Sequence, residues 1–204
     1  MKTFDKLELA EPLVRALKDL DHKTPTPIQI QAIPPALGGR DVMGIAQTGT
    51  GKTAGFTLPT LTHIFEKDQD PPKRGARVLV LAPTRELASQ IAESVRNYGR
   101  HMLRLSVACV YGGVPIARQI KRLTGGNDVL VATPGRLIDL LDRKAIKTRS
   151  NRDFDFGRSR SNAGYGLYPC PQKNREGAAA KPPNPVFLRD PRAEDKSPFQ
   201  AIPK

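Results

Sequence analysis

The sequence has 204 residues, a length that suits one or two domains. Hydrophobic residues make up 38%, aromatic residues 5%, and the formal net charge is +13. This charge favours an anionic partner such as nucleic acid or a membrane surface, although a basic solvated surface has the same composition. The sequence has no run of about 18 apolar residues and no apolar leader, so we expect a cytoplasmic, soluble chain without a spanning helix.

Cysteine and histidine positions argue against a structural metal. Cys109 and Cys170 are too few and too far apart for a disulfide scaffold or a metal cluster, and His22, His63 and His101 lack ligand spacing. We therefore expect only the Mg²⁺ that accompanies a bound nucleotide.

Helical and extended patterns alternate along the chain up to Lys147. The pattern predicts helices over 11–20, 27–37, 52–65, 85–98, 115–123 and 134–143. It predicts strands over 42–45, 77–82, 105–111 and 128–132. The strands are near-continuous apolar runs, which are typical of a parallel sheet covered by helices on both faces. The predicted fold class is α/β.

Residues 46–53 form a glycine-rich segment between the first strand and a helix. In order they are Ala46, Gln47, Thr48, Gly49, Thr50, Gly51, Lys52 and Thr53. Glycines allow backbone N–H groups to point at a polyphosphate, the lysine reaches the β/γ-phosphates, and the Thr53 hydroxyl can ligate Mg²⁺. Lys and Thr directly after the last glycine favour this interpretation over an ordinary loop. We expect ATP to bind here.

Three further motifs follow the second, third and fourth strands. They are Pro83-Thr84-Arg85, Gly112-Gly113, and Thr133-Pro134-Gly135-Arg136. Carboxyl ends of strands in open α/β sheets bind ligands, and hydroxyls, glycine backbone and arginine suit phosphates. Each motif alone also suits a capped helix, because threonine is a good N-cap and proline suits the first turn. Three such motifs on one edge of the sheet favour a surface that binds nucleic acid over three separate helix caps.

In this order, with Thr-Pro-Thr-Pro-Ile-Gln at 24–29, the motifs resemble the first RecA-like domain of DEAD-box RNA helicases over residues 2–147. The overall sequence is similar to the bacterial RhlE-type subgroup. The resemblance implies that Phe4 stacks on adenine and Gln29 reads its edge. It also implies that the phosphate loop holds ATP and that the three edge motifs hold single-stranded RNA by its backbone. Asp21-His22 stands where the family usually has glycine and an aromatic residue.

Two motifs of that family do not occur in the sequence: Asp-Glu-Ala-Asp, which holds Mg²⁺ and positions the attacking water, and Ser-Ala-Thr. A second RecA-like domain with arginine fingers is not seen either. We therefore assign no catalytic residue, and we expect an incomplete domain that is inactive as an ATPase.

Residues 148–204 have a different composition. They hold 8 of the 19 prolines, and Leu, Ile, Val and Phe make up only 8 of 57 residues. Such a segment buries too little apolar surface to offset its chain entropy. We predict a disordered tail without helix or strand.

A shifted reading frame explains this tail. Permitted codons for residues 154–161, read one nucleotide further on, give Leu-Ile-Leu-Asp-Glu-Ala-Asp. The same shift turns residues 162–168 into Met-Leu-Asp-Met-Gly-Phe-Ile and residues 184–190 into Thr-Leu-Phe-Phe-Ser-Ala-Thr. Both missing motifs thus recur in one frame, which indicates a frameshift near Thr148.

Three functions compete. The first is an RNA helicase family member that is inactive as written, and the second is a non-enzymatic module that binds nucleotide or RNA. The third, another phosphate-loop class such as a small-molecule kinase, would not need the motifs at 24–29 and 83–88. RNA-stimulated ATP hydrolysis would favour the first function, and binding without hydrolysis would favour the second.

Overall fold

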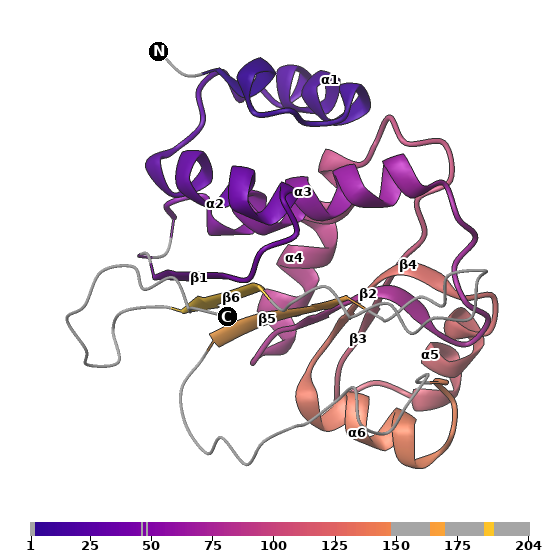
Figure 1. The fold of residues 1–204 in the computed structure, drawn as a ribbon. Helices are drawn as coiled ribbons and strands as arrows, with labels where there is room; N and C mark the ends of the chain where they lie inside the picture. The colour runs from indigo at the N-terminus through magenta and orange to yellow at the C-terminus, as the bar shows by residue number, and fades with distance from the viewer. Residues whose placement is uncertain (1–2, 46, 48, 148–163, 170–185, 190–204) are drawn as a thin grey trace.

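The computed structural model describes residues 3–45, 47, 49–147, 164–169 and 186–189, and Figure 1 shows them as one sheet with flanking helices. A short 3₁₀ helix, η1, spans Phe4–Lys6. The α-helices are α1 (Glu11–Asp19), α2 (Pro27–Leu37), α3 (Lys52–Lys67), α4 (Arg85–Tyr98), α5 (Ile116–Leu123) and α6 (Pro134–Asp142). The strands are β1 (Val42–Ile45), β2 (Ala76–Leu81), β3 (Val107–Val110), β4 (Asn127–Ala132), β5 (Gly164–Pro169) and β6 (Val186–Arg189).

The six strands lie in the order β1-β6-β5-β2-β4-β3. Strands β2, β4 and β3 are parallel, with Val78 and Val107 both opposite Val129. Strand β6 is parallel to β1, whereas β5 is antiparallel to both β6 and β2. It follows that β1 to β4 all run in one direction. Their carboxyl ends therefore meet at one edge of the sheet.

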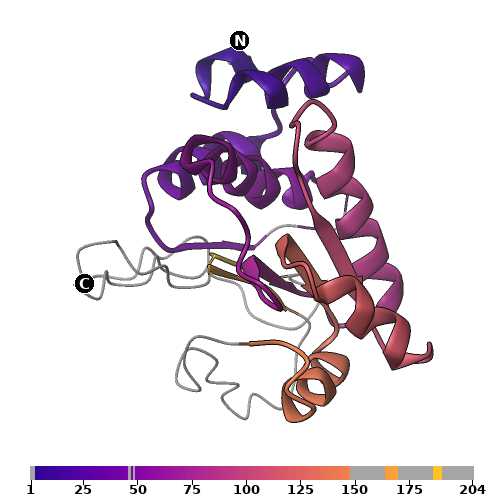
Figure 2. The same cartoon turned by 90° about the vertical axis from the view of Figure 1, so that its right-hand side faces the viewer.

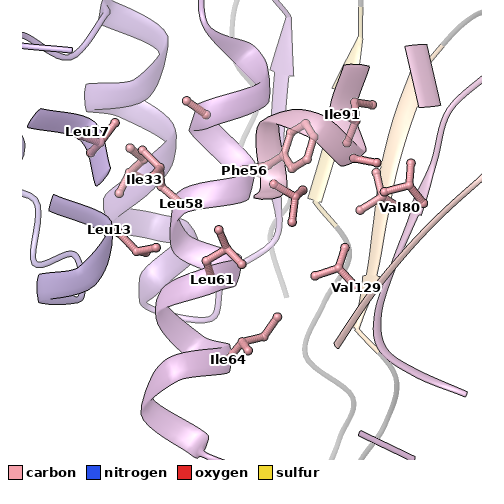
Figure 3. Close-up of a cluster of buried hydrophobic side chains, with 14 of the residues drawn as sticks. Leu13, Leu17, Ile33, Phe56, Leu58, Leu61, Ile64, Val80, Ile91 and Val129 are labelled. Atoms are coloured by element: carbon pink, nitrogen blue, oxygen red, sulfur yellow. The ribbon is translucent and has the colours of Figure 1, made fainter. Parts of the chain in front are cut away.

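Alternation along the strands divides the core into two layers. One face carries Val80 and Val129, which pack against side chains of α1 to α4; Figure 3 shows this cluster. The other face carries Leu79 and Leu130, which pack against α5 and α6. Successive residues of a strand point to opposite faces, so a continuous apolar run serves both layers. Figure 2 shows the sheet between α1–α3 above and α6 below.

The N-terminal helix α1 is attached to the end of α4. His101 Nε2 lies 2.5 Å from Asp19 Oδ2, and the His22 and Tyr98 ring centroids are 6.1 Å apart. The Asp21 backbone has φ +56°, the left-handed region that favours glycine. The His22 ring packs on the Tyr98 ring. This chain therefore makes a ring contact at the position where the resemblance implies an aromatic residue.

All ten helices and strands expected before residue 148 are confirmed, with ends that differ by two residues or fewer. The regular apolar periodicity of these segments explains the agreement. In the described part of the chain, no helix is long and apolar enough to cross a membrane.

The prediction of a tail without strands is wrong for two short segments, β5 and β6, which complete the middle of the sheet. They pair with the inner edges of β2 and β1, so both of these edges have partners. Open backbone edges bind any extended segment through main-chain groups, which periodicity does not reveal. The remainder of 148–204 lies outside the described residues.

Candidate functional site

The phosphate loop lies between β1 and the N-terminus of α3, as its sequence predicts. Gly49 and Gly51 have φ of +86° and +83°, conformations that a side chain disfavours. Lys52 opens α3 and is only 6% exposed. Thr50 Oγ1 donates to Gln47 O at 2.8 Å and so closes the turn. Ala46 and Thr48 lie outside the described residues.

Gln29 supports this loop from α2. Its Oε1 accepts the Thr26 N–H at 2.9 Å, and its Nε2 donates to Gly51 O at 3.1 Å. A side chain at position 51 would collide with the Gln29 amide. The residue predicted to read adenine therefore also holds the last glycine of the loop in place.

These features fit a nucleotide polyphosphate. The loop places left-handed glycines at a helix N-terminus, a position that favours anions because the first backbone N–H groups of a helix have no intrahelical acceptor. Thr26 Oγ1 is buried next to Gly51 and has no hydrogen-bond partner among the described residues. Phe4 is 5% exposed and belongs to the core, so its stacking on adenine stays a prediction.

The three edge motifs lie together at the carboxyl ends of β2, β3 and β4. The Thr133 N–H donates to Val110 O at 3.0 Å, which joins the ends of β4 and β3. Thr84 caps α4, because its Oγ1 accepts the Leu87 N–H at 3.3 Å. Thr133 is the N-cap residue directly before α6, but among the described residues its side chain makes no capping hydrogen bond. Its hydroxyl is therefore not used for capping.

Arg85 connects the first edge motif to the second. Its Cζ lies 5.2 Å from the centroid of the Tyr111 ring. A Cβ at Gly113, whose φ is +80°, would lie 3.2 Å from Arg85 Nη1. Arg85, Gly112 and Gly113 are exposed. Sequence reasoning missed Tyr111, although its place directly before two glycines was a usable signal.

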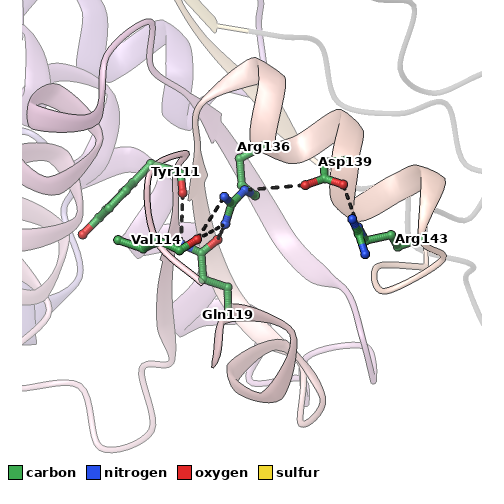
Figure 4. A network of polar contacts seen from close by, with 6 residues as sticks. All are labelled: Tyr111, Val114, Gln119, Arg136, Asp139 and Arg143. Carbon is green, nitrogen blue, oxygen red and sulfur yellow. Dashed lines mark hydrogen bonds and ion pairs between the residues drawn. The ribbon is translucent and has the colours of Figure 1, made fainter. Parts of the chain in front are cut away.

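Arg136 connects the third motif to the second (Figure 4). Its Nη1 and Nη2 both donate to Val114 O at 3.1 Å, and Nη1 also donates to Gln119 Oε1 at 2.9 Å. Its Nε lies 3.9 Å from Asp139 Oδ2. The side chain is 11% exposed. Among the edge-motif residues, Pro83, Pro134 and Gly135 are exposed, whereas Arg136 points into the protein.

An open cavity of about 400 Å³ lies along β3 next to Tyr111, between α4 and α5. Arg96, Arg122 and Cys109 are among its lining residues, and Arg96 Nη2 donates to Val107 O at 3.3 Å. Burial raises the pKa of the Cys109 thiol, with Arg96 opposing the shift. This thiol is therefore protonated near neutral pH and a poor nucleophile. In the described ranges, no group of three or more His, Cys, Asp or Glu side chains could hold a metal ion.

The similarities to known proteins agree with this geometry. A profile of the DEAD/DEAH box helicase family matches residues 26–155. The chain is 48% identical over 144 residues to "ATP-dependent RNA helicase DeaD" of Klebsiella pneumoniae, which is 71% of this chain and 22% of that protein. The protein of the same name from Escherichia coli strain K12 is 47% identical over the same length. The chain thus spans about a fifth of the length of these relatives.

A solved structure shows the same fold. The crystal structure of a DEAD box protein from the hyperthermophile Methanococcus jannaschii matches with a TM-score of 0.62 and 32% identity, covering 72% of this chain and 39% of that one. The expected RecA-like α/β fold is thereby confirmed. The profile covers more than half of the chain, and the motif order and the fold agree with it. The chain belongs to the DEAD/DEAH box helicase family.

Proposed function

We propose that this chain binds ATP and single-stranded RNA at the carboxyl edge of its sheet, as part of an ATP-dependent RNA helicase of the cytoplasm, and that as written it does not hydrolyse ATP. One observation carries the proposal: β1, β2, β3 and β4 end on the same edge, with the phosphate loop after β1 and an exposed motif after each of the other three. Three strand spacings, about 14 Å, separate β1 from β2.

The nucleotide would be held by the phosphate loop. Backbone N–H groups around Gly49 and Gly51 would bind the phosphates, Lys52 would neutralise the β/γ-phosphates, and the Thr53 hydroxyl would ligate Mg²⁺. Gln29 and Phe4 would contact the adenine. Bound ATP supplies the phosphoanhydride bond on which the helicase family depends. The residues of this chain supply its binding and orientation.

RNA would lie across the other three strand ends. Exposed Arg85 offers charge, Gly112 and Gly113 offer backbone N–H groups, and the Thr133 hydroxyl is not used for capping. With a net charge of +13, RNA binding should release counterions from the phosphates. The RNA affinity should therefore fall steeply as the salt concentration rises, because the release of these ions into solution then becomes less favourable. We expect little sequence preference, because backbone contacts do not read bases.

ATP hydrolysis has requirements beyond the binding of ATP. Phosphoryl transfer needs a positioned metal, a positioned water and stabilisation of the transition-state charge. Asp-Glu-Ala-Asp and Ser-Ala-Thr are missing from the sequence, and an arginine finger alone is worth roughly 10³–10⁵ in rate. We infer that a frameshift near Thr148 removed these motifs, which divides the chain into 1–147 and an out-of-frame 148–204.

A titration with a fluorescent ATP analogue tests nucleotide binding. Lys52→Ala should weaken binding by about tenfold or more, because a phosphate contact of a charged donor is lost. Lys67→Ala, at the exposed last turn of the same helix, serves as the matched control and should change nothing. Equal affinities of the two variants would contradict the assignment of the loop.

A non-enzymatic binding module remains the alternative function. The two proposals differ in turnover: any RNA-stimulated ATP hydrolysis favours the helicase family member, and binding without hydrolysis favours the binding module. Resequencing the gene around codon 148 tests the frameshift directly. RNA-stimulated ATP hydrolysis by the purified chain, at the rate of an intact enzyme, would contradict the inference that the chain does not hydrolyse ATP.

A further inference from the structure

Gln119 lies outside every motif that the sequence analysis singles out, yet it occupies a central place at the RNA edge (Figure 4). It is on α5 and is 7% exposed. Its Nε2 donates to Tyr111 O at 3.1 Å, and its Oε1 accepts from Arg136 Nη1 at 2.9 Å. A carbonyl only accepts and a guanidinium only donates, so these two partners determine how the amide is oriented.

Together Gln119 and Arg136 hold both ends of the loop that contains Gly112 and Gly113. Gln119 binds the carbonyl of Tyr111, just before the glycines, and Arg136 binds the carbonyl of Val114, just after them. Two successive glycines have more conformational freedom than any other pair of residues. Without these two attachments, ordering of the loop would have to occur when a ligand binds, at a cost in affinity.

The guanidinium of Arg136 has few donors left for a ligand. Two of its nitrogens donate to Val114 O, one of them also to Gln119, and the third faces Asp139. Asp139 Oδ1 in turn accepts from Arg143 Nε at 2.7 Å. Lysine could not replace such a fork, because it presents a single charged point.

We propose that Gln119 and Arg136 are positioning residues of the RNA site: they pre-order the Gly112–Gly113 loop for the RNA backbone, and Arg136 acts through the loop rather than as a phosphate contact. This inference rests on the proposed RNA binding. It extends that proposal to a residue that no motif contains, and it changes the role expected for Arg136.

The salt dependence of RNA binding separates positioning from contact. Removing a direct phosphate contact lowers the slope of log affinity against log salt by about 0.7 for single-stranded nucleic acid. Removing a positioning residue weakens binding at every salt concentration and leaves the slope unchanged. We expect Gln119→Met and Arg136→Lys each to weaken binding of a single-stranded RNA by about tenfold. We also expect Arg136→Gln to weaken binding without lowering the slope.

Two further variants complete the design. Gln119→Glu keeps the acceptor for Arg136 but places an oxygen against Tyr111 O, so it should weaken RNA binding even if Gln119→Met does not fold. Gln31→Met makes the same chemical change at an exposed glutamine of α2 and should bind RNA like the parent chain. Affinity for the ATP analogue should be unchanged in all variants that fold.

Hydrogen exchange of the full chain without RNA tests the loop separately. The amides of residues 112–114 should exchange faster in Gln119→Met and Gln119→Glu than in the parent or Gln31→Met. Unchanged exchange, or faster exchange with unchanged RNA affinity, would overturn the positioning role. A slope lowered by about 0.7 in Arg136→Gln would show that Arg136 contacts phosphate. If the parent chain binds no RNA, the proposed function fails, whereas the exchange result still decides whether these residues order the loop.

Discussion

The sheet consists of two regions that differ in strand direction and in sequence pattern. Strands β2, β4 and β3 are parallel and apolar, and helices cover both of their faces. Strands β5 and β6 come from a segment with no periodic pattern, and β5 runs antiparallel to both neighbours. The parallel strands β2, β4 and β3 are connected through helices encoded in the sequence, whereas β5 and β6 pair with open edges through main-chain groups, β5 antiparallel and β6 parallel. The comparison shows that short strands from a segment without periodicity can complete a sheet whose other strands are periodic.

The largest effect should come from restoring the reading frame. Under the proposed frameshift, a one-nucleotide change near codon 148 would replace residues 148–204 with a segment that contains Leu-Ile-Leu-Asp-Glu-Ala-Asp. We expect the free energy of unfolding to rise by about 3 kcal/mol or more, because the shifted frame supplies the apolar run Leu-Ile-Leu for a central strand. Urea unfolding of both chains measures this. Superimposable unfolding curves would mean that the present β5 and β6 already stabilise the sheet as well as the family's strands.

Proline substitutions compare the two regions directly. Val131→Pro in β4 should abolish the cooperative unfolding transition, because proline removes a ladder hydrogen bond within the helix-covered part. Leu188→Pro in β6 should have a smaller effect and leave a cooperative transition. Thermal unfolding followed by circular dichroism gives both results. A reversed order of damage would show that the middle of the sheet dominates stability.

A buried ion pair ties β2 to β4 at the opposite edge from the candidate site. Arg77 Nη1 lies 3.2 Å from Asp128 Oδ1, with both side chains about 5–6% exposed. Asp128→Ala would leave Arg77 buried without its counter-charge and would free the Ser106 N–H that Asp128 also binds. We expect a loss of about 3–5 kcal/mol in chemical denaturation. ATP-analogue affinity of the fraction that remains folded should not change.

The smallest effect concerns the attachment of α1. A hydrogen bond from His101 holds the pKa of the Asp19 carboxyl below its ordinary value of 3.8. A carboxyl with a lowered folded-state pKa stabilises the fold above its unfolded pKa and loses this contribution as pH falls through the folded value. Asp19→Asn should therefore flatten the fall in unfolding midpoint between about pH 5 and 3.

Asp5→Asn is the control for that measurement. Asp5 is also an exposed carboxylate of the N-terminal segment, and its Oδ1 lies 3.5 Å from Lys18 Nζ. An equal flattening in both variants would mean that the His101 contact has no special role. The experiment also tests whether the N-terminal segment with Phe4 loosens before the sheet does.

Much of the candidate site could be read from residue types alone. Left-handed φ at Gly49 and Gly51 was predictable, because a phosphate cradle needs glycine there. The meeting of the three edge motifs followed from the parallel pattern. Arg136 could not be read in this way, because an arginine beside a proposed RNA track suggests a phosphate contact. Its actual partners, Val114 and Gln119, are separated from it by 22 and 17 residues.

The sequence by itself determined the ten elements before residue 148, the phosphate loop and the order of the motifs, since each depends on local periodicity or on backbone freedom at named residues. Tertiary structure alone decided the antiparallel insertion of β5, the pairing of β6 with β1, and the bridge that Gln119 makes between Tyr111 and Arg136. These features depend on which backbone edges and buried polar groups still need hydrogen-bond partners after the other elements have packed. Such groups come together only after distant segments have packed.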